Sequence, residues 1–385
     1  MPRILGVLAA AALVSCSSMP SLNPFDWFGS GASGPKPAEL PALSNPSPVR
    51  VLWSSSIGAA EGYVFSPVLA GDSVYAAARD GTIARYDAAT GQVRWRTSVG
   101  TRLSAGVGSD GTLAVVATEE GEVFALDAEN GKLRWKARVS SEVLGAPAVG
   151  EDLVLVRSAD SRIFAFGVAD GKRRWVFQRA AASLIVRSPA GVTLHEKSAY
   201  AGFSSGKLVA IALSNGGARW EATVAVPKGS TELERVTDII GNPAAQGREV
   251  CAAAYQGRVA CYDAQSGAPQ WARELSTLTG VSFDARYAFV SDDRGAVHAL
   301  DRTNGRSIWK QDRLAYRRLS LPLPLGSEVA LGDFQGYVHF LSRDAGTFVA
   351  RFATDGSPVL SAPLRLPSGF LMQTRNGGLY ALSLR

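Results

Sequence analysis

One interval of 14 residues recurs along this chain. In six copies a small residue opens the interval, a tryptophan closes it, and a glycine stands four positions before the tryptophan. The six intervals are Gly81–Trp95, Gly121–Trp135, Ser161–Trp175, Gly206–Trp220, Gly257–Trp271 and Gly295–Trp309. A seventh copy opening at Gly336 has Ala350 in place of tryptophan, and an eighth opens at Gly377 and stops at Arg385. Self-similarity at a fixed period is typical of repeat architectures.

Each copy has the pattern of a hairpin preceded by two short strands. The opening glycine suits a tight turn, and the alternating apolar residues after it predict a strand. A second turn follows, and then the tryptophan strand, whose large ring is expected to pack on the neighbouring copy. The 336 residues after Val49 allow about 42 per copy. Four antiparallel strands in that length are typical of a propeller blade, so we predict an all-β, eight-bladed β-propeller.

The two ends of the chain complement each other. The eighth copy lacks a tryptophan strand, while residues 49–55 (Val-Arg-Val-Leu-Trp-Ser-Ser) look like such a strand without its repeat. We therefore expect the N-terminal strand to complete the last blade, which closes the ring and removes an open sheet edge. The prediction is one propeller domain over residues 49–385.

Residues 1–48 have a different character. Residues 1–15 are a signal peptide by pattern: Arg3, then a short apolar run that is too short to span a membrane. Leu13 to Cys16 resembles a bacterial lipobox, which implies that Cys16 is lipidated, and Ser17 resembles an outer-membrane sorting signal. The alternative is an ordinary secretory signal without lipidation. Residues 16–48 are rich in Ser, Gly and Pro, and we expect a flexible tether on the periplasmic side of the outer membrane.

Length variation is confined to the stretches between one tryptophan and the next opening residue. These stretches measure 26, 26, 31, 37, 24 and 27 residues, and the two long ones are consecutive. We expect the extra residues in blade-to-blade connectors, ending before Ser188-Pro189 and Asn242-Pro243, as neighbours on one face of the disc. Apolar residues beside charges in both connectors suit a protein-docking patch. The alternative is that the apolar residues cap the core.

No residue set argues for catalysis. The regular aspartates recur at one turn position, which favours turn formation over a unique catalytic role; they are Asp87, Asp127, Asp263 and Asp301. Three histidines fall in separate copies, and three cysteines leave little for a metal site. The net charge of +6 comes without a basic block, so we expect no nucleic-acid partner.

The tryptophan repeat resembles that of quinoprotein (PQQ) dehydrogenases. Those enzymes are usually much longer and often carry an adjacent Cys-Cys pair, which this chain lacks. We therefore expect a protein without cofactor, metal or enzymatic activity. A small periplasmic quinoprotein dehydrogenase and a propeller that binds peptides or envelope polymers are the alternatives.

Cys251 and Cys261 flank Gln256 symmetrically. A three-residue loop would place the two thiols opposite each other, and a two-residue turn would point them to opposite faces of the hairpin. An oxidising compartment favours a disulfide, so the pair is a candidate bridge whose formation depends on the register.

The lipobox, tether and eight repeats together resemble the BamB family, the lipoprotein subunit of the β-barrel assembly (BAM) complex of the outer membrane. The most specific segment is Gly229 to Asp238, together with Ser183 to Arg187. The resemblance implies a non-catalytic scaffold that docks on the POTRA domains of BamA and assists insertion of unfolded β-barrel precursors. It implies four contact residues: Leu184, Val186, Arg187 and Asp238. A second acidic residue that the family pattern expects after Asp238 is Ile240 here.

Overall fold

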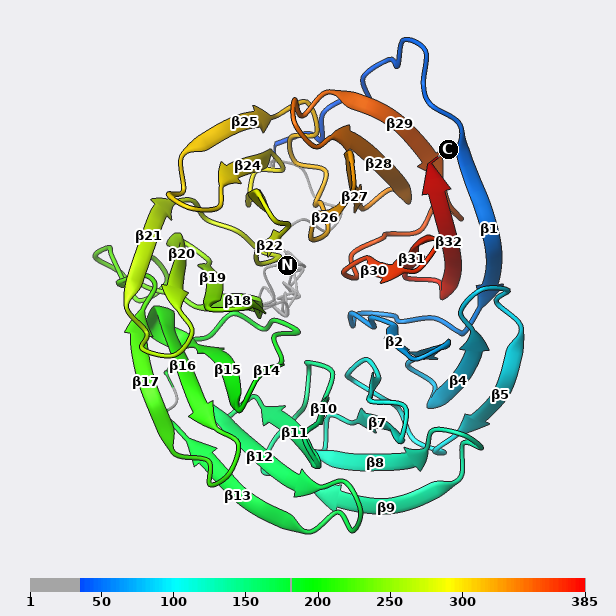
Figure 1. The fold of residues 1–385 in the computed structure, drawn as a ribbon, viewed down its shortest axis with the longest axis vertical. Helices are drawn as coiled ribbons and strands as arrows, with labels where there is room; N and C mark the ends of the chain where they lie inside the picture. Colours follow the sequence, from blue (N-terminus) through cyan, green and yellow to red (C-terminus); the bar gives the residue numbers. More distant parts are fainter. Residues whose placement is uncertain (1–34, 181, 385) are drawn as a thin grey trace, which may run out of the picture. The chain divides into compact units, whose positions relative to one another are not determined.

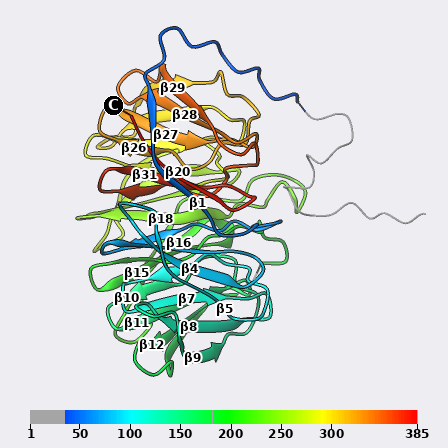
Figure 2. The same cartoon turned by 90° about the vertical axis from the view of Figure 1, so that its right-hand side faces the viewer.

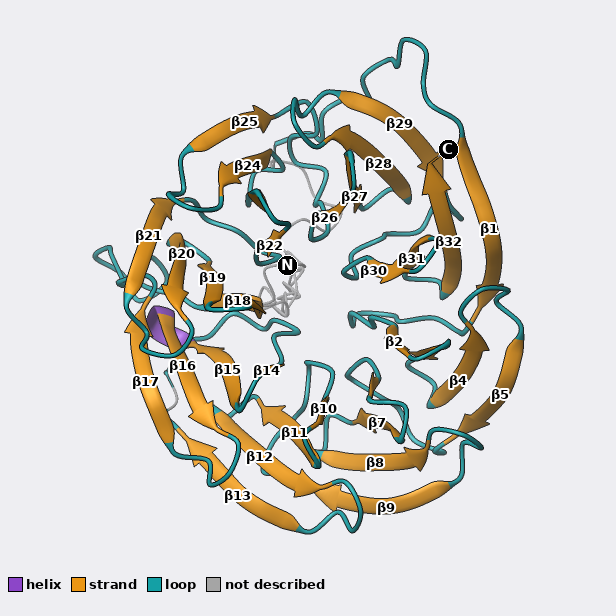
Figure 3. Ribbon diagram, in the orientation of Figure 1, coloured by secondary structure: helices purple, strands orange, loops and turns teal. Residues whose placement is uncertain are grey.

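The computed structural model describes residues 35–180 and 182–384. In this part of the chain 32 strands form eight four-stranded antiparallel sheets, arranged as blades around a ring (Figure 1). The only helical element described is one 3-10 turn, η1 (Ser204–Gly206), drawn in purple in Figure 3. The prediction of an all-β, eight-bladed propeller is confirmed.

In blades 1 to 7 the strands follow chain order from the ring centre outward, and in blade 8 the first strand of the chain, β1, takes the outermost place. Blade 1 holds β2 (Val68–Ala70), β3 (Ser73–Ala77), β4 (Thr82–Asp87) and β5 (Val93–Ser98). Blade 2 holds β6 (Gly108–Ser109), β7 (Leu113–Ala117), β8 (Glu122–Asp127) and β9 (Leu133–Arg138). Blade 3 holds β10 (Ala148–Gly150), β11 (Leu153–Ser158), β12 (Arg162–Gly167) and β13 (Arg173–Gln178). Blade 4 holds β14 (Thr193–His195), β15 (Ser198–Phe203), β16 (Lys207–Ala212) and β17 (Ala218–Thr223).

The second half of the ring repeats this plan. Blade 5 holds β18 (Ile239–Gln246), β19 (Glu249–Ala254), β20 (Arg258–Asp263) and β21 (Pro269–Glu274). Blade 6 holds β22 (Ser282–Phe283), β23 (Tyr287–Ser291), β24 (Val297–Asp301) and β25 (Ser307–Gln311). Blade 7 holds β26 (Leu323–Leu325), β27 (Glu328–Gly332), β28 (Tyr337–Ser342) and β29 (Phe348–Ala353). Blade 8 holds β30 (Leu364–Leu366), β31 (Gly369–Gln373), β32 (Gly378–Leu384) and β1 (Val49–Ser56).

Blade 8 closes the ring with strands from both ends of the chain. Strand β1 pairs antiparallel with β32, so that Val49 lies opposite Leu384 and Ser56 opposite Gly378. The outermost strand of the last blade therefore comes from the start of the domain, as predicted. Closure of this kind leaves no unpaired strand between the first and last blades.

The tryptophans explain the constant interval. The ring of each tryptophan within residues 35–384 packs on the glycine in the outer turn of the next blade, and its indole N–H donates to a backbone carbonyl of that turn at 2.7–3.0 Å. Trp309 of blade 6, for example, donates to the carbonyl of Arg343 in blade 7 and covers Gly346. The opening turn and the tryptophan are the two ends of the interval, and each makes a fixed contact. The number of residues between them is therefore the same in each hairpin. Ala350 stands at the corresponding position of blade 7, so blade 8 receives no such ring.

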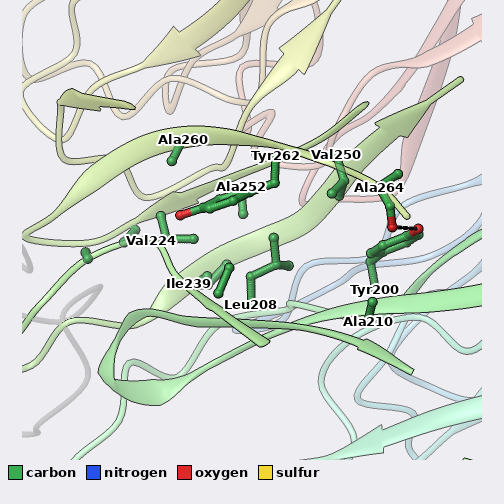
Figure 4. Packing of buried hydrophobic residues seen from close by; sticks show 13 residues of the cluster. Tyr200, Leu208, Ala210, Val224, Ile239, Val250, Ala252, Ala260, Tyr262 and Ala264 are labelled. Atoms are coloured by element: carbon green, nitrogen blue, oxygen red, sulfur yellow. Dashed lines mark hydrogen bonds between the residues drawn. The ribbon is translucent and has the colours of Figure 1, made fainter. Parts of the chain in front are cut away.

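Among the described residues, each gap between neighbouring blades is filled by its own cluster of buried apolar side chains. Figure 4 shows the cluster between blades 4 and 5, where Leu208, Ile239 and Val250 pack between Tyr200 and Tyr262. The second strands of the blades are almost wholly buried because neighbouring sheets cover both of their faces. Outer strands alternate between exposed and half-buried residues instead.

The regular aspartates are turn residues. Oδ1 of Asp87 accepts hydrogen bonds from the backbone N–H groups of Ala89 and Thr90, at 3.0 and 2.9 Å. Asp127 and Asp263 make the same pair of bonds in their own turns. The hydrogen bond from Arg94, followed by these backbone bonds, holds the pKa of Asp87 below the ordinary value. For Asp263 the bond from the Ser266 backbone N–H is the main cause of the lowered pKa.

Cys251 and Cys261 face each other directly across strands β19 and β20, and they form a disulfide. The loop between the strands has three residues, and Gln256 adopts a positive φ of 48° within it. Of the two registers that the sequence allows, the structure has the one that brings the sulfur atoms together.

The chain ahead of β1 lies on blades 6 and 7 as a strap, residues 35–48 (Figure 2). The carbonyl of Ala38 accepts a hydrogen bond from Arg317 at 3.0 Å, and that of Pro41 accepts one from Arg351 at 2.8 Å. Arg317 is itself held by the buried carboxylate of Asp333, which also binds His339 at 2.9 Å. This part of the sequence predicted as a tether is therefore fastened to the propeller by buried polar groups.

Candidate protein-docking face

The two long connectors lie side by side. The first runs from β13 to β14 (residues 179–192), and the second runs from β17 to β18 (residues 224–238). The N–H of Val186 donates to Asp238 at 2.6 Å, and the N–H of Gly191 donates to Oδ1 of Asn242 at 2.6 Å. The expectation of neighbouring insertions is confirmed. The strands that follow them begin elsewhere than expected: β14 begins at Thr193, after the Ser-Pro pair, and β18 begins before Asn242 and contains an irregularity there.

The second connector is ordered by a small hydrogen-bonded turn. The carboxylate of Glu234 accepts hydrogen bonds from the N–H groups of Ser230 and Thr231, and the Thr231 hydroxyl accepts one from the N–H of Glu234. This reciprocal pattern is a capping box. The same backbone bonds lower the pKa of Glu234. Leu233 sits inside the turn and is exposed, so the loop presents an apolar side chain on a fixed backbone.

Asp238 holds the two connectors together. Its side chain is only 6% exposed, and its carboxylate is occupied by the N–H of Val186. Burial raises the pKa of Asp238, while the backbone N–H groups and the nearby Arg157 oppose that rise. The acidic residue is thus turned inward, and its structural effect is to fix the backbone of the first connector.

Arg157 is the buried cation beneath this junction. Burial lowers the pKa of Arg157 to about 10, and the charge of Asp238 works against that shift. Its guanidinium lies over the ring of Phe203 at 5.3 Å, and its Nη1 has no hydrogen-bond partner among the described residues. Removal of the Asp238 carboxylate would leave this cation without its counter-charge, which is costly in a buried place.

Arg187 reaches from the first connector to residues of two other blade-to-blade connectors. Its guanidinium binds Glu142 at 2.9 Å and donates to the hydroxyl of Tyr63 at 3.3 Å. It also lies over the Tyr63 ring at 5.1 Å, and Arg79 lies over the same ring at 4.2 Å. Tyr63 and Glu142 belong to the connectors that lead into blades 1 and 3, so Arg187 is oriented by three parts of the ring.

Tyr63 and Glu142 could not be predicted from the sequence. They stand 124 and 45 residues from Arg187 along the chain, and no local pattern links them to it. Only the curvature of the ring brings the three connectors together.

The apolar part of the face is formed by Leu184 and Ile185, which are 37% and 45% exposed. Val186 is half-buried because its backbone is tied to the second connector. Ile185 therefore adds to the exposed apolar residues that the sequence analysis selected. Ile240 is buried in β18 opposite Ala253, so it presents nothing on this face.

Apart from one group formed by Glu249, Cys251 and Cys261, the candidate metal-ligating residue types are dispersed in the described chain. His195 binds a backbone carbonyl in the neighbouring blade, and His298 and His339 each bind an aspartate in their own blade. The sulfur atoms of Cys251 and Cys261 are joined to each other. No helix among the described residues has the length and apolar character needed to cross a membrane.

These features define a class: a closed, tryptophan-docked propeller with two long, neighbouring connectors. Comparisons with known proteins agree with this class and identify one family within it. A family model described as outer membrane protein assembly factor BamB matches residues 79–311. The BamB proteins of Bordetella pertussis and Pseudomonas aeruginosa are 42% and 45% identical over 360 and 352 residues, covering 93% and 91% of this chain and 93% of each relative. The chain belongs to the BamB family, and it is a non-catalytic assembly factor for outer membrane proteins.

Solved structures show the same fold. BamB from Moraxella catarrhalis superposes with a TM-score of 0.80 at 26% identity, covering 87% of this chain and all of that one. A europium-containing methanol dehydrogenase superposes with a TM-score of 0.68 at 14% identity, covering 87% of this chain and 93% of that chain, which shows a shared fold alone. The resemblance of the tryptophan repeat to quinoprotein dehydrogenases is therefore a likeness of architecture.

Proposed function

We propose that this protein docks on the POTRA domains of BamA through the face formed by residues 179–192 and 224–238. The observation that carries the proposal is the setting of Arg187, which Tyr63 and Glu142 orient at the ring opening beside the exposed Leu184 and Ile185. An oriented guanidinium next to an apolar anchor is the combination found in binding hot spots.

Within this proposal the four residues selected from the sequence have different parts. Leu184 supplies apolar contact and Arg187 a charge-assisted contact. Val186 and Asp238 act through the backbone, because their hydrogen bond fixes the loop that presents the other two. A preformed loop loses less entropy on binding than a mobile one, so affinity depends on this bond as well.

The test is binding of the chain from Ser17 onward to the purified periplasmic arm of BamA. We expect Arg187→Glu to weaken binding by at least about 30-fold, as for a hot-spot arginine. The control is Lys310→Glu, an equal charge reversal on the outer strand of blade 6, which should leave binding unchanged. Equal binding by wild type and Arg187→Glu would refute the site, and absence of wild-type binding would refute the docking proposal as a whole.

We also propose that Cys16 carries a lipid and anchors the protein to the outer membrane on its periplasmic side. Cys16 lies outside the described residues, so the proposal depends on the lipobox pattern and on membership of an outer-membrane family. Mass spectrometry of the protein from membranes should find a lipidated N-terminal cysteine. A Cys16→Ser variant that still fractionates with the membrane would refute anchoring through this residue.

A further inference from the structure

The outer edge of blades 1–3 is a strip of positive charge. We call the segments 92–98, 132–138 and 172–178 the basic rim; each runs from three residues before a tryptophan to three after it. Figure 1 shows their strands β5, β9 and β13 following one another along the outside of the ring. The rim has nine basic residues, all exposed, and no acidic residue: Arg94, Arg96, Lys132, Arg134, Lys136, Arg138, Lys172, Arg173 and Arg174.

The other five blades do not share this composition. Their equivalent segments, taken together, hold six basic residues and three acidic ones: 217–223, 268–274, 306–312, 347–353 and 50–56. The positive charge is therefore concentrated on three consecutive blades, although the fold asks for the same outer strand in all eight. Propeller geometry does not require it, because outer-strand side chains beside the tryptophan face solvent.

Part of the basic rim is neutralised locally and part is free. Arg94, Arg134 and Arg174 each pair with aspartates of adjoining turns at 2.6–3.5 Å. The remaining six have no such carboxylate. Within the described residues, the side chains of four of them make no ion pair or hydrogen bond at all: Lys132, Arg138, Lys172 and Arg173.

Apolar side chains alternate with these cations. Val93 and Leu133 are 51% and 50% exposed, and Val176 on the third strand is also exposed. A strip of long flexible cations with apolar side chains between them suits the surface of a bilayer, where anionic headgroups lie above acyl chains. A folded protein partner would call for a shaped pocket or paired polar groups, and the strip repeats one simple pattern instead.

We propose that the basic rim binds the surface of a membrane that contains anionic phospholipids. The disc then meets the bilayer on its edge, with blades 1–3 toward the lipid. This orientation leaves the connector face free for a protein partner, so the inference is independent of the docking proposal. Each Lys or Arg near an anionic surface contributes about a fivefold increase in partitioning.

The test uses the chain from Ser17 onward, which has no lipid and keeps every described residue. Its co-sedimentation is measured with vesicles of phosphatidylethanolamine containing about one-third phosphatidylglycerol, and with vesicles of phosphatidylcholine alone. The rim variant carries Lys132→Glu, Arg138→Glu, Lys172→Glu and Arg173→Glu. The control variant carries Arg50→Glu, Arg273→Glu, Arg306→Glu and Lys310→Glu, an identical charge change on exposed residues in or directly before the outer strands of other blades.

We expect wild type and control to bind the anionic vesicles with partition coefficients within a few-fold of each other. Neither should bind vesicles of phosphatidylcholine alone. The rim variant should partition more than about 100-fold less, and added salt should weaken wild-type binding. Equal losses in both variants would show an effect of net charge alone and overturn the proposal. So would a rim variant that binds vesicles normally but loses the periplasmic arm of BamA, because the rim would then be a protein contact. Circular dichroism establishes that both variants are folded.

Discussion

Replacement of Gly346 by alanine tests whether tryptophan docking holds neighbouring blades together. Gly346 lies in the outer turn of blade 7 with a φ of 67°, and a Cβ placed on it would stand 2.5 Å from Cε3 of Trp309. The Trp309 ring cannot move away without weakening a hydrogen bond, because its indole N–H donates to the carbonyl of Arg343 at 2.7 Å. The variant must either move the ring or move the turn.

Three effects set the size of the change. The left-handed backbone costs alanine about 1–2 kcal/mol, and the stiffer unfolded chain returns about 0.4–1 kcal/mol. Overpacking against the ring costs about 1–3 kcal/mol, with about 1 kcal/mol more if the indole hydrogen bond is lost. We expect a decrease of about 2–4 kcal/mol in the free energy of unfolding, measured by urea denaturation followed by circular dichroism.

The matched control is Gly326→Ala in the same blade. Gly326 has a similar φ of 64°, and a Cβ placed on it would have no neighbouring atom within 4 Å. The free energy of unfolding of this variant should fall by only about 1 kcal/mol, which is the part of the effect that comes from the backbone. In a Trp309→Ala background the two glycine replacements should lower the free energy of unfolding by the same amount. A Gly346→Ala change no larger than that of Gly326→Ala in the wild-type chain would refute the role given to the ring contact.

Three further outcomes follow from the buried polar groups. Asp238→Ala should speed hydrogen exchange at the Val186 amide about tenfold or more, and unchanged exchange would contradict the role of this bond. Burial lowers the pKa of His339 below its ordinary 6.5, so the unfolded chain binds its proton first and stability falls as the pH drops below about 6.5. The urea midpoint of His339→Gln should therefore fall less between pH 7.5 and 5.5 than that of wild type; an equal fall would exclude His339 as a source. Arg351→Met should free the strap, seen as several-fold faster cleavage after Glu39 by a glutamate-specific protease, and an unchanged rate would show that the strap is held elsewhere.

The architecture could be predicted because its signals repeat over short distances. A turn glycine, an alternating strand and a docked tryptophan are neighbours in the chain, and each copy supports the others. The pairing of the two chain ends could be predicted equally well, because residues 49–55 have the strand pattern that the eighth copy lacks. In the structure β1 pairs with β32. Strand limits were harder to predict where a long connector precedes a blade, as at Thr193.

The chemistry of the docking face was only partly predictable. The pattern of connector lengths located both loops, and the family resemblance selected Asp238 without showing that its carboxylate is turned inward to Val186. Nothing near Arg187 in the chain pointed to Tyr63 or Glu142. Side chains from separate connectors meet only after the blades have taken their places in the ring.

The repeat, the number of blades and the closure of the ring follow from the amino-acid order, because they depend on hydrogen bonds and packing within and between adjacent copies. The register of the Cys251–Cys261 hairpin does not follow from the amino-acid order, because the same residues are compatible with a two-residue and with a three-residue turn. The folded ring settles that register, the setting of Arg187 and the fastening of the strap by Arg317 and Arg351. The setting of Arg187 and the fastening of the strap join residues distant in the chain, and the distances between them are set by the curvature of the closed ring.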